Sequence, residues 1–256
     1  MNKLYKDSNW LESKYVIEML SDSEIGNLCK ASSIVSRYWR KKFEISTRTR
    51  GERGHLAKAN HCILSSEAVN WINGELLGDG CLYAQSNYSA LVLYGSKFSE
   101  YIKYVSATLD SFGVKICGKI NKYYHKKMDC YSYTYSSLCY EELLILRNNW
   151  YLNNKKIVPR NIKLTPLVCR QWYIGDGGLA HPKYGRPSIQ LWTNGFPISD
   201  VEWLKGELVK LGFKATRWLT SNSIHISVDS TKDFLKYVGP CPVNRYQYKW
   251  DYDKLK

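Results

Sequence analysis

Apolar residues recur three and four positions apart in several segments of this chain, which predicts amphipathic or buried helices. Two of these segments, residues 70–82 and 167–179, each read as an apolar helix that stops at the tripeptide Gly-Asp-Gly. Glycine is the usual residue just past a helix C-terminus. The two copies are separated by 97 residues, counted from Asp79 to Asp176. The spacing therefore predicts a repeated unit in which each helix delivers one carboxylate at its end.

Alternating apolar and polar positions follow each of these helices and predict strands. In the first copy we expect strands within 82–96, a helix at 99–113, strands near 115–122 and 130–135, and a helix at 140–150. The second copy repeats this order, with strands within 179–194, a helix at 199–211, strands at 214–220 and 224–228, and a helix at 231–238. Each half reads α-β-β-α-β-β-α, which predicts an α+β fold with two halves, residues 66–158 and 159–256.

A period of 97 residues is too long for a solenoid and instead predicts a duplicated half-domain with a pseudo-twofold axis. We expect the two leading helices to meet at that axis. Gly74, Gly78 and Gly175 would allow their backbones to approach closely. Gln171 occupies the position that matches Gly74, so the packing between the helices is expected to be asymmetric.

Both aspartates are expected at the C-terminal end of a helix, where a carboxylate needs a positively charged partner. The C-terminal end of a helix carries partial negative charge, so a carboxylate there is disfavoured unless something positive lies beside it. A divalent cation is the simplest such partner. Two aspartates that merely occupy tight turns are the alternative, but their recurrence at equivalent positions favours a site.

Residues 9–43 form a separate pattern of three short helices. Ser21, Asp22 and Glu24 are typical of a helix N-terminus. A short turn then leads into a basic third helix at 33–43, in which Ile34, Val35, Tyr38 and Trp39 are expected to face the core. The polar residues expected outside are Ser33, Ser36, Arg37, Arg40 and Lys41. This arrangement predicts a DNA-binding helix-turn-helix module over residues 1–44; a plain three-helix packing unit with a solvated basic face is the alternative.

Residues 45–65 are polar, basic and interrupted by glycine, which is typical of a linker. Arg48 and Arg50 could follow a phosphate backbone or enter a minor groove. A solvated linker explains the same residues equally well.

Composition narrows the class of partner. The formal net charge is +14 and the pI is about 9.3, with basic residues interleaved among many Tyr and Trp. That balance favours a nucleic-acid partner over a merely soluble basic protein. Eight scattered cysteines without a C-x-x-C pair argue against a zinc site or disulfide framework and for a reducing intracellular compartment. The N-terminus does not read as a signal peptide, and no apolar run approaches the roughly 20 residues that a membrane span needs.

The two motifs resemble those of the LAGLIDADG homing endonucleases, in particular the branch with motifs like Leu-Leu-Gly-Asp-Gly and Trp-Tyr-x-Gly-Asp-Gly. Further similar segments are Lys156-Ile157-Val158-Pro159, Leu164-Thr165-Pro166, Thr193-Asn194-Gly195-Phe196 and Tyr246-Gln247-Tyr248-Lys249-Trp250. The resemblance covers roughly residues 66–252. Two motifs at matched spacing with matched downstream elements are a specific signal, whereas one alone would be weak.

The resemblance implies a saddle of antiparallel sheets with the motif helices crossing at its centre. It implies that Asp79 and Asp176 hold divalent metal, usually Mg²⁺, with Mn²⁺ or Ca²⁺ as substitutes and Ca²⁺ in a non-cleaving state. The carbonyls of Gly78 and Gly175 would lie close to the same metals. It further implies a monomer that cuts both strands of a long, asymmetric double-stranded DNA target. Oxygen ligands suit Mg²⁺, and two metals could activate water and relieve phosphate charge.

Other site candidates follow from the same resemblance and from strand alternation. Lys156 and Lys249 follow the last helix of each half and are candidates to polarise the attacking water; phosphate positioning is the alternative. Ser96, Lys97, Thr193 and Asn194 end the second strand of each half, where a scissile phosphate or central base pair would lie. Candidates for sequence reading on outward strand positions are Gln190, Trp192, Asn194, His225, Arg217, Lys119 and Asn121.

Three other functions remain compatible with the sequence. The same fold could serve as an RNA maturase that binds its own intron RNA, or as a DNA-binding regulator with an inactive nuclease core. Retention of both acids favours the nuclease, although a maturase can retain them. An intein homing domain is disfavoured because residues 1–60 form a helical module instead of a splicing block.

Overall fold

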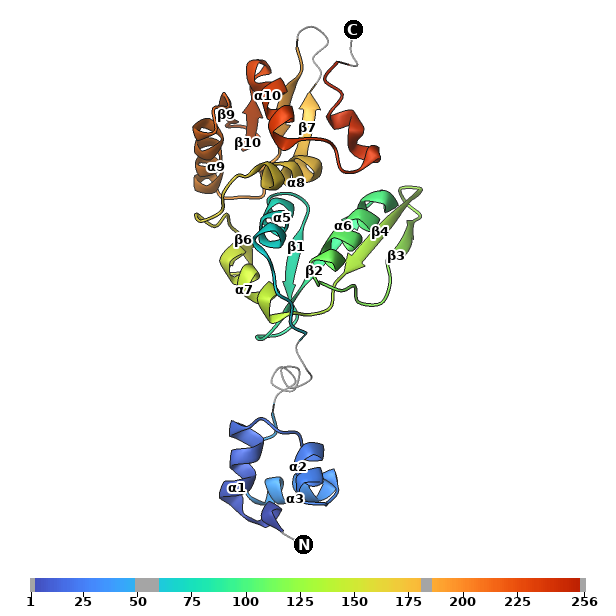
Figure 1. The fold of residues 1–256 in the computed structure, drawn as a ribbon, viewed down its shortest axis with the longest axis vertical. Coiled ribbons are helices and arrows are strands. Elements are labelled where there is room, and N and C mark those ends of the chain that lie inside the picture. The colour runs from blue at the N-terminus through green and yellow to red at the C-terminus, as the bar shows by residue number, and fades with distance from the viewer. Residues whose placement is uncertain (1–2, 49–59, 181–185, 254–256) are drawn as a thin grey trace. The chain divides into compact units, whose positions relative to one another are not determined.

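The computed structural model describes residues 3–48, 60–180 and 186–253 of the chain (Figure 1). The fold divides into two compact units, one of residues 1–59 with 86–88 and the other of residues 60–85 with 89–256. Arg50 lies outside the described residues, and so does the expectation that it contacts DNA. Within the described ranges, no helix has the length and apolar character that crossing a bilayer requires. All eight cysteines are free, as the scattered spacing predicts.

The N-terminal unit is a small helical bundle. Its elements are η1 (Leu4–Lys6), α1 (Ser8–Glu12), the π-helical η2 (Ser13–Ile17), α2 (Asp22–Leu28) and α3 (Ser33–Lys42). Ser21 begins α2 with a capping box: its hydroxyl accepts from the Glu24 N–H at 3.2 Å, and its own N–H donates to the Glu24 carboxylate at 2.8 Å. Leu11, Tyr15 and Ile25 form the buried centre, and Ile45 packs against it.

The larger unit contains both predicted halves in the predicted order. The first half consists of α5 (Ser66–Leu77), β1 (Cys81–Ala84), β2 (Ala90–Ser96), α6 (Ser99–Ser111), β3 (Asn121–His125), β4 (Cys130–Ser136) and α7 (Glu141–Trp150), followed by the hairpin β5 (Tyr151–Leu152) and β6 (Lys155–Lys156). The second half consists of α8 (Pro166–Asp176), β7 (Gly177–Ala180), β8 (Ser188–Leu191), α9 (Ile198–Lys210), β9 (Ala215–Trp218), β10 (Ser223–Ile226), α10 (Val228–Val238) and η3 (Asn244–Lys249).

The two sheets have the same topology, which confirms the predicted duplication. The strand order is β1-β2-β4-β3 in the first sheet and β7-β8-β10-β9 in the second, and every pairing is antiparallel. One strand is shorter than predicted. Residues 115–120 form a loop with a single bridge from Ile116 to Ser137, and β3 begins at Asn121.

Helices α5 and α8 pack directly against each other at the centre of the larger unit (Figure 1). Three predicted glycines make this approach possible. A Cβ added at Gly74 would lie 2.6 Å from the Val168 carbonyl oxygen and 2.7 Å from Gln171 Cβ. A Cβ added at Gly78 would lie 3.3 Å from Gly175 Cα, so the two helix ends adjoin.

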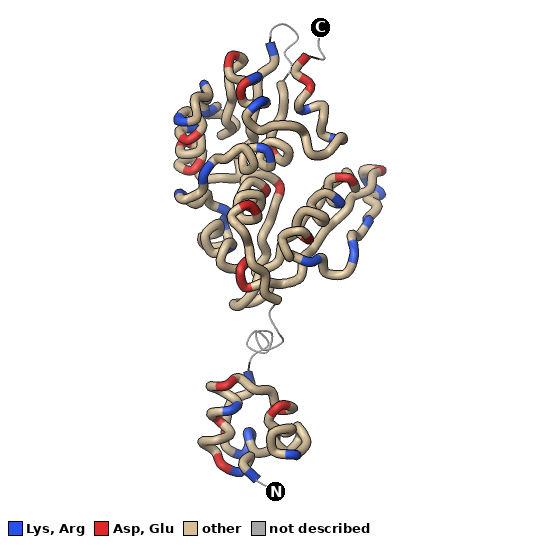
Figure 2. The backbone as a smooth tube through the Cα atoms, viewed as in Figure 1, with Lys and Arg blue, Asp and Glu red and all other residues tan. Residues whose placement is uncertain are grey.

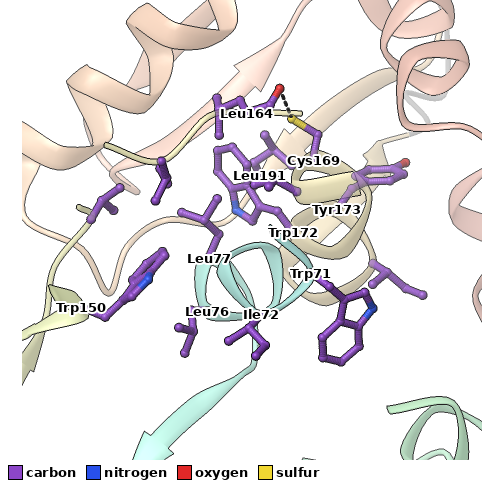
Figure 3. Packing of buried hydrophobic residues seen from close by; sticks show 14 of the residues in the cluster. Trp71, Ile72, Leu76, Leu77, Trp150, Leu164, Cys169, Trp172, Tyr173 and Leu191 are labelled. Carbon is purple, nitrogen blue, oxygen red and sulfur yellow. Dashed lines mark hydrogen bonds between the residues drawn. The ribbon is translucent and has the colours of Figure 1, made fainter. Parts of the chain in front are cut away.

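The remaining faces of both helices are buried in one continuous core. Trp71, Leu76 and Leu77 of α5 and Trp172 and Tyr173 of α8 are at most 2% exposed (Figure 3). The core thus extends from one half into the other. Burial of this much apolar surface is what holds the two helix ends in a fixed arrangement.

Candidate metal and nucleic-acid site

The two predicted acids lie at the adjoining ends of α5 and α8. Helix α5 ends at Leu77, Gly78 follows as its C-cap, and Asp79 comes next; Asp176 is the last residue of α8. A Cβ added at Gly175 would lie 3.1 Å from the Asp79 backbone nitrogen. The structure therefore brings the two Gly-Asp-Gly segments together, as expected from the repeat.

The two carboxylates influence each other electrostatically. Burial, and then the negative charge of Asp79, raise the pKa of Asp176 to about 6, against the opposing effect of Lys156 and Lys249. A like charge nearby disfavours ionisation in this way. Asp79 itself is exposed, whereas Asp176 is half-buried. A bound divalent cation would offset this repulsion and favour the ionised form of both acids.

A lysine lies beneath each helix end. Lys156 Nζ donates to the carbonyl oxygens of Gly78 at 3.2 Å and Gly80 at 2.8 Å. Lys249 Nζ donates to those of Ile174 at 2.7 Å and Gly175 at 3.1 Å. Each lysine thus compensates the negative end of its own motif helix. Burial lowers the pKa of both, that of Lys249 to about 8, although the two aspartates act in the opposite direction.

The donor set fits a hard divalent cation. It consists of two carboxylates and the main-chain carbonyls of Gly78 and Gly175, all of them oxygen ligands of the kind that Mg²⁺ and Ca²⁺ prefer. Each carbonyl already accepts one hydrogen bond from a lysine and has a second lone pair. Among the described residues no cluster of three or more His, Cys, Asp or Glu forms a metal site. Water or a phosphate could complete the coordination of such a cation.

Strand register shows which side chains share the outward face of the second sheet. Gln190 is paired with His225, and Ile189 and Leu191 point to the core. His225 stacks on Trp218 with ring centroids 5.0 Å apart, and Gln190 donates to Ser223 at 3.1 Å. Trp192 and Asn194 beyond the strand are exposed. Gln190, Trp192, Asn194 and His225 are therefore placed as the alternation predicts.

The outward face of the first sheet is more apolar. Its positions alternate with the buried Leu82, Val92 and Tyr135. They are Cys81, Tyr83, Leu91, Leu93, Gly95, Asn121, Tyr123, His125, Cys130, Ser132, Thr134 and Ser136. Asn121 lies on this face as predicted; Lys97 and Lys119 are exposed on the adjoining loops. Figure 2 shows basic residues along β3 and the turn into β4.

Three predicted contact residues of the two sheets point elsewhere. Arg217 pairs with the core residue Ile224 and binds Glu202 at 2.6 Å, so it lies on the opposite face from His225. Thr193 is 1% exposed, and its hydroxyl donates to the Asn222 carbonyl oxygen at 2.6 Å. Ser96 Oγ accepts from the Phe98 N–H at 3.1 Å ahead of α6. These three side chains therefore do not share the outward face with Gln190 and His225, because each is held by a local hydrogen bond or ion pair.

Helix α3 is rotated from the predicted orientation. Ser36 and Arg40 are buried, and both bind Asp22 of α2, Arg40 through two contacts at 3.3 Å. Ile34 and Tyr38 are instead 72% and 60% exposed. The outward face therefore carries Ile34, Arg37, Tyr38 and Lys41, with Ser33 partly exposed at its start.

Arg48 also turns inward instead of extending along the linker. Its guanidinium donates to the carbonyl oxygens of Tyr15 and Leu20 and stacks 3.7 Å from the Tyr15 ring centre. Arg40 stacks 4.3 Å from the same ring centre. Ser36 and Arg40 are thus structural residues of the N-terminal unit, and their predicted outward placement was wrong. Arg48 is half-buried against the same ring, and its contact with DNA stays a prediction.

Sequence reasoning missed one polar group near the acids. Glu75 is fully buried in α5 and accepts hydrogen bonds from the hydroxyls of Tyr94 and Tyr101. The available signal was an acid in the middle of an otherwise apolar helix, which a buried helix does not normally contain. Trp218 was also missed as a partner of His225; only the strand register reveals it.

Comparisons with known proteins agree with this architecture. The LAGLIDADG DNA endonuclease family matches residues 69–234. An uncharacterised protein of Methanocaldococcus jannaschii, MJ1098, is 27% identical over 95% of this chain and 97% of its own length. The cytochrome b mRNA maturase bI2 of Debaryomyces hansenii is 26% identical over 73% of this chain and 74% of its own. The homing endonuclease I-WcaI, solved bound to its DNA recognition sequence, superposes with a TM-score of 0.65 at 19% identity, covering 82% of this chain and 96% of that one.

Proposed function

This chain belongs to the LAGLIDADG DNA endonuclease family, and from that premise we propose that it is a site-specific endonuclease. It would cut both strands of a long, asymmetric DNA target as a monomer, by divalent-metal-dependent hydrolysis. The observation that carries the proposal is the paired site. Asp79 and Asp176 lie at the C-terminal ends of adjoining helices, and a lysine lies under each helix end.

We assign a separate role in the reaction to each residue of the site. Asp79 and Asp176, with the Gly78 and Gly175 carbonyls, would hold divalent metal, each acid serving the cut of one strand. The metal would supply charge relief at the phosphate and an acidified water. Lys249, whose pKa burial lowers to about 8, is able to exchange a proton near neutral pH. Lys156, bound to the Gly78 and Gly80 carbonyls, holds the first segment in place and contributes positive charge.

The outward sheet faces supply the DNA contacts in this proposal. Gln190 and His225 present amide and imidazole groups, which can hydrogen-bond base edges in a major groove. Leu91, Leu93 and Tyr83 on the first sheet present apolar groups that suit thymine methyls. The two half-sites would accordingly be read by different chemistry, as an asymmetric target requires.

Two substitutions test the catalytic proposal. Asp79→Asn and Asp176→Asn each remove one anionic ligand and should each abolish linearisation of target-bearing plasmid in Mg²⁺, a loss of about 10²-fold or more. DNA affinity, measured by gel shift in Ca²⁺, should stay within about threefold because neither change removes a positive charge. The target is first found by cleavage mapping on a library of candidate sites.

Asp110→Asn provides the matched control. Asp110 lies on α6 and pairs with Lys115 at 2.8 Å, on an exposed surface. The same chemical change there should leave cleavage unaltered. If either site variant cuts both strands at the wild-type rate, the assignment of the acids is wrong.

RNA splicing is the second candidate function. It is favoured by the similarity to the Debaryomyces hansenii maturase over 73% of this chain. Binding of an intron RNA, with faster splicing and no plasmid linearisation, would select the maturase function. Linear plasmid product selects the nuclease.

A further inference from the structure

Glu75 is a buried acid one helical turn before Asp79, and the proposed chemistry does not use it. Its side chain is 1% exposed. The hydroxyls of Tyr94 on β2 and Tyr101 on α6 both donate to its Oε2 at 2.7 Å, while Oε1 is buried without a partner. Burial raises the pKa of Glu75 to about 8, although the two tyrosine hydrogen bonds act in the opposite direction. Such a group costs stability, which points to a role beyond packing.

The Glu75 cluster contacts the segment that carries Asp79. The Glu75 carbonyl oxygen accepts from the Gly78 N–H at 3.1 Å and from the Gly80 N–H at 2.8 Å. The Tyr94 hydroxyl, fixed by the Glu75 carboxyl, lies against Gly80, where an added Cβ would come within 2.6 Å of it. Backbone and side chain of residue 75 therefore both constrain Gly78–Gly80.

The second half holds its acid differently. At the equivalent positions, 97 residues further along the chain, Trp172 replaces Glu75 and Leu191 replaces Tyr94. These two residues cannot form the carboxyl–hydroxyl pair. Instead the strand ladder reaches the acid: Gly177 pairs with Leu191, and the Trp192 N–H donates to the Asp176 carbonyl oxygen at 2.8 Å. In the first half the ladder begins at Cys81 paired with Leu93, so Asp79 precedes the ladder by two residues.

We propose that Glu75 is a positioning residue for the first acid. Through its hydrogen bond with Tyr94, Glu75 fixes the segment Gly78–Gly80, which contains Asp79. In the second half, the pairing of β7 with β8 fixes Asp176 instead. The inference rests on the proposed nuclease function, in which each acid serves the cut of one strand, and adds that the two strand cuts depend on different supports. Loss of the Glu75–Tyr94 contact therefore changes the cut served by Asp79 more than the cut served by Asp176.

The test measures the two strand cuts separately, on a duplex target labelled with a different dye on each strand, using the full-length protein and Mg²⁺. Glu75→Leu and Tyr94→Phe should each change the ratio of the two cutting rates by about tenfold, because small misplacements of catalytic groups have effects of that size. Glu75→Gln should retain the wild-type ratio within about twofold, since its amide oxygen can accept both tyrosine hydroxyls.

Amide hydrogen exchange gives a readout that does not require cleavage. Exchange of the Gly80 N–H should become about tenfold faster in Glu75→Leu and Tyr94→Phe, while the Gly177 N–H keeps its wild-type rate. Tyr135→Phe is the matched control: Tyr135 is equally buried in the same sheet, and its hydroxyl contacts the Val114 carbonyl oxygen at 3.4 Å, away from Gly80. It should alter neither readout.

The outcomes separate this inference from the proposed function. The positioning role is overturned if Glu75→Leu slows the cutting of both strands equally. It is also overturned if the ratio of the two cutting rates and the exchange rate of the Gly80 N–H both stay unchanged. If the wild-type protein cuts neither strand, the nuclease proposal fails, but faster Gly80 exchange in Glu75→Leu still supports the positioning of the Asp79 segment. If Glu75→Gln behaves like Glu75→Leu, the hydrogen bonds are not the cause and the inference is wrong.

Discussion

Asp176 is a carboxylate in a place that favours its neutral form. It lies at the negative end of α8, half-buried and beside a second acid, and these surroundings raise its pKa from 3.8 to about 6. In the unfolded chain it would ionise near its ordinary pKa. Because the unfolded chain loses this proton at lower pH than the folded protein does, stability falls as pH rises from about 4 to about 6.

Asp176→Asn should therefore stabilise the metal-free protein at pH 8 by about 2 kcal/mol, after allowance for partial solvent screening. That corresponds to an increase in Tm of about 4–8 °C for a unit of this size. At pH 4 the gain should shrink to about 0.5 kcal/mol, because the folded Asp176 carboxyl is then neutral and only its unfolded form is partly ionised. Differential scanning calorimetry in EDTA at the two pH values measures the difference.

Asp110→Asn serves again as the control and should show no gain at pH 8. Addition of Mg²⁺ should stabilise the wild type and leave Asp176→Asn unchanged, since a ligand stabilises only the state that binds it. A variant that melts with the wild type at both pH values would contradict the assigned electrostatics of the site.

The placement of a site residue was predictable from the sequence where the repeat determined its position. Asp79 and Asp176 followed from the recurring tripeptide, and the motif resemblance pointed to Lys156 and Lys249. Arg40 and Arg217 were not predictable, because a basic side chain on a helix or strand looks the same in sequence whether it faces solvent or a buried acid. Asp22 and Glu202, which bind them, lie on other elements, 18 and 15 residues earlier in the chain.

At the scale of elements, the α5–α8 contact determines how close the two acids are. Gly74 lies against the backbone of α8, where an added Cβ would come 2.6 Å from the Val168 carbonyl oxygen. A neighbour made of backbone cannot rotate away. The helices would have to separate, and both Gly-Asp-Gly segments would move with them.

Gly74→Ala should accordingly destabilise the protein by about 1–3 kcal/mol through overpacking and reduce cleavage. Gly206→Ala, in the middle of α9 with open space around its Cβ position, should instead be neutral or stabilise by about 0.5–1 kcal/mol, as alanine does in a helix. Urea unfolding monitored by tryptophan fluorescence compares them. Equal effects of the two substitutions would show that the interhelix contact is looser than described.

The order of the elements was predictable because helix and strand periodicities differ strongly and the pattern occurs twice. The start of β3 was not: Lys115 to Ile120 contains enough apolar residues to resemble a strand, yet it forms a loop. The rotation of α3 was also missed. Apolar periodicity placed Ile34 and Tyr38 inside, but the Arg40–Asp22 pair determines which face is buried.

At the scale of the whole molecule, the net charge of +14 is divided between two compact units. The outward face of α3 in the smaller unit offers Arg37 and Lys41 beside Ile34 and Tyr38. Basic and apolar side chains on one exposed helix face suit a DNA groove, where phosphates and base edges are both within reach. We propose that this unit adds DNA contacts to those of the larger one.

Arg37→Ala combined with Lys41→Ala should weaken target binding and reduce the magnitude of the slope of log affinity against log salt by about 1 per lost phosphate contact. The cleavage position should stay the same because the acids are untouched. Fluorescence anisotropy between 50 and 200 mM salt measures the slope. Lys205→Ala combined with Lys210→Ala on α9, which removes the pairs with Glu202 and Glu207, is the charge-matched comparison. An unchanged slope in the double variant would exclude α3 as a DNA-contacting helix.

The mismatch of Gly74 with Gln171 has an evolutionary consequence. The glycine leaves room for the glutamine, with the added Cβ position only 2.7 Å from Gln171 Cβ. A protein assembled from two copies of the second half would bring two glutamines into that space and force the copies apart, whereas two copies of the first half would leave a void. Neither half alone should therefore form a symmetric homodimer through this contact unless the residue that faces its partner is first changed.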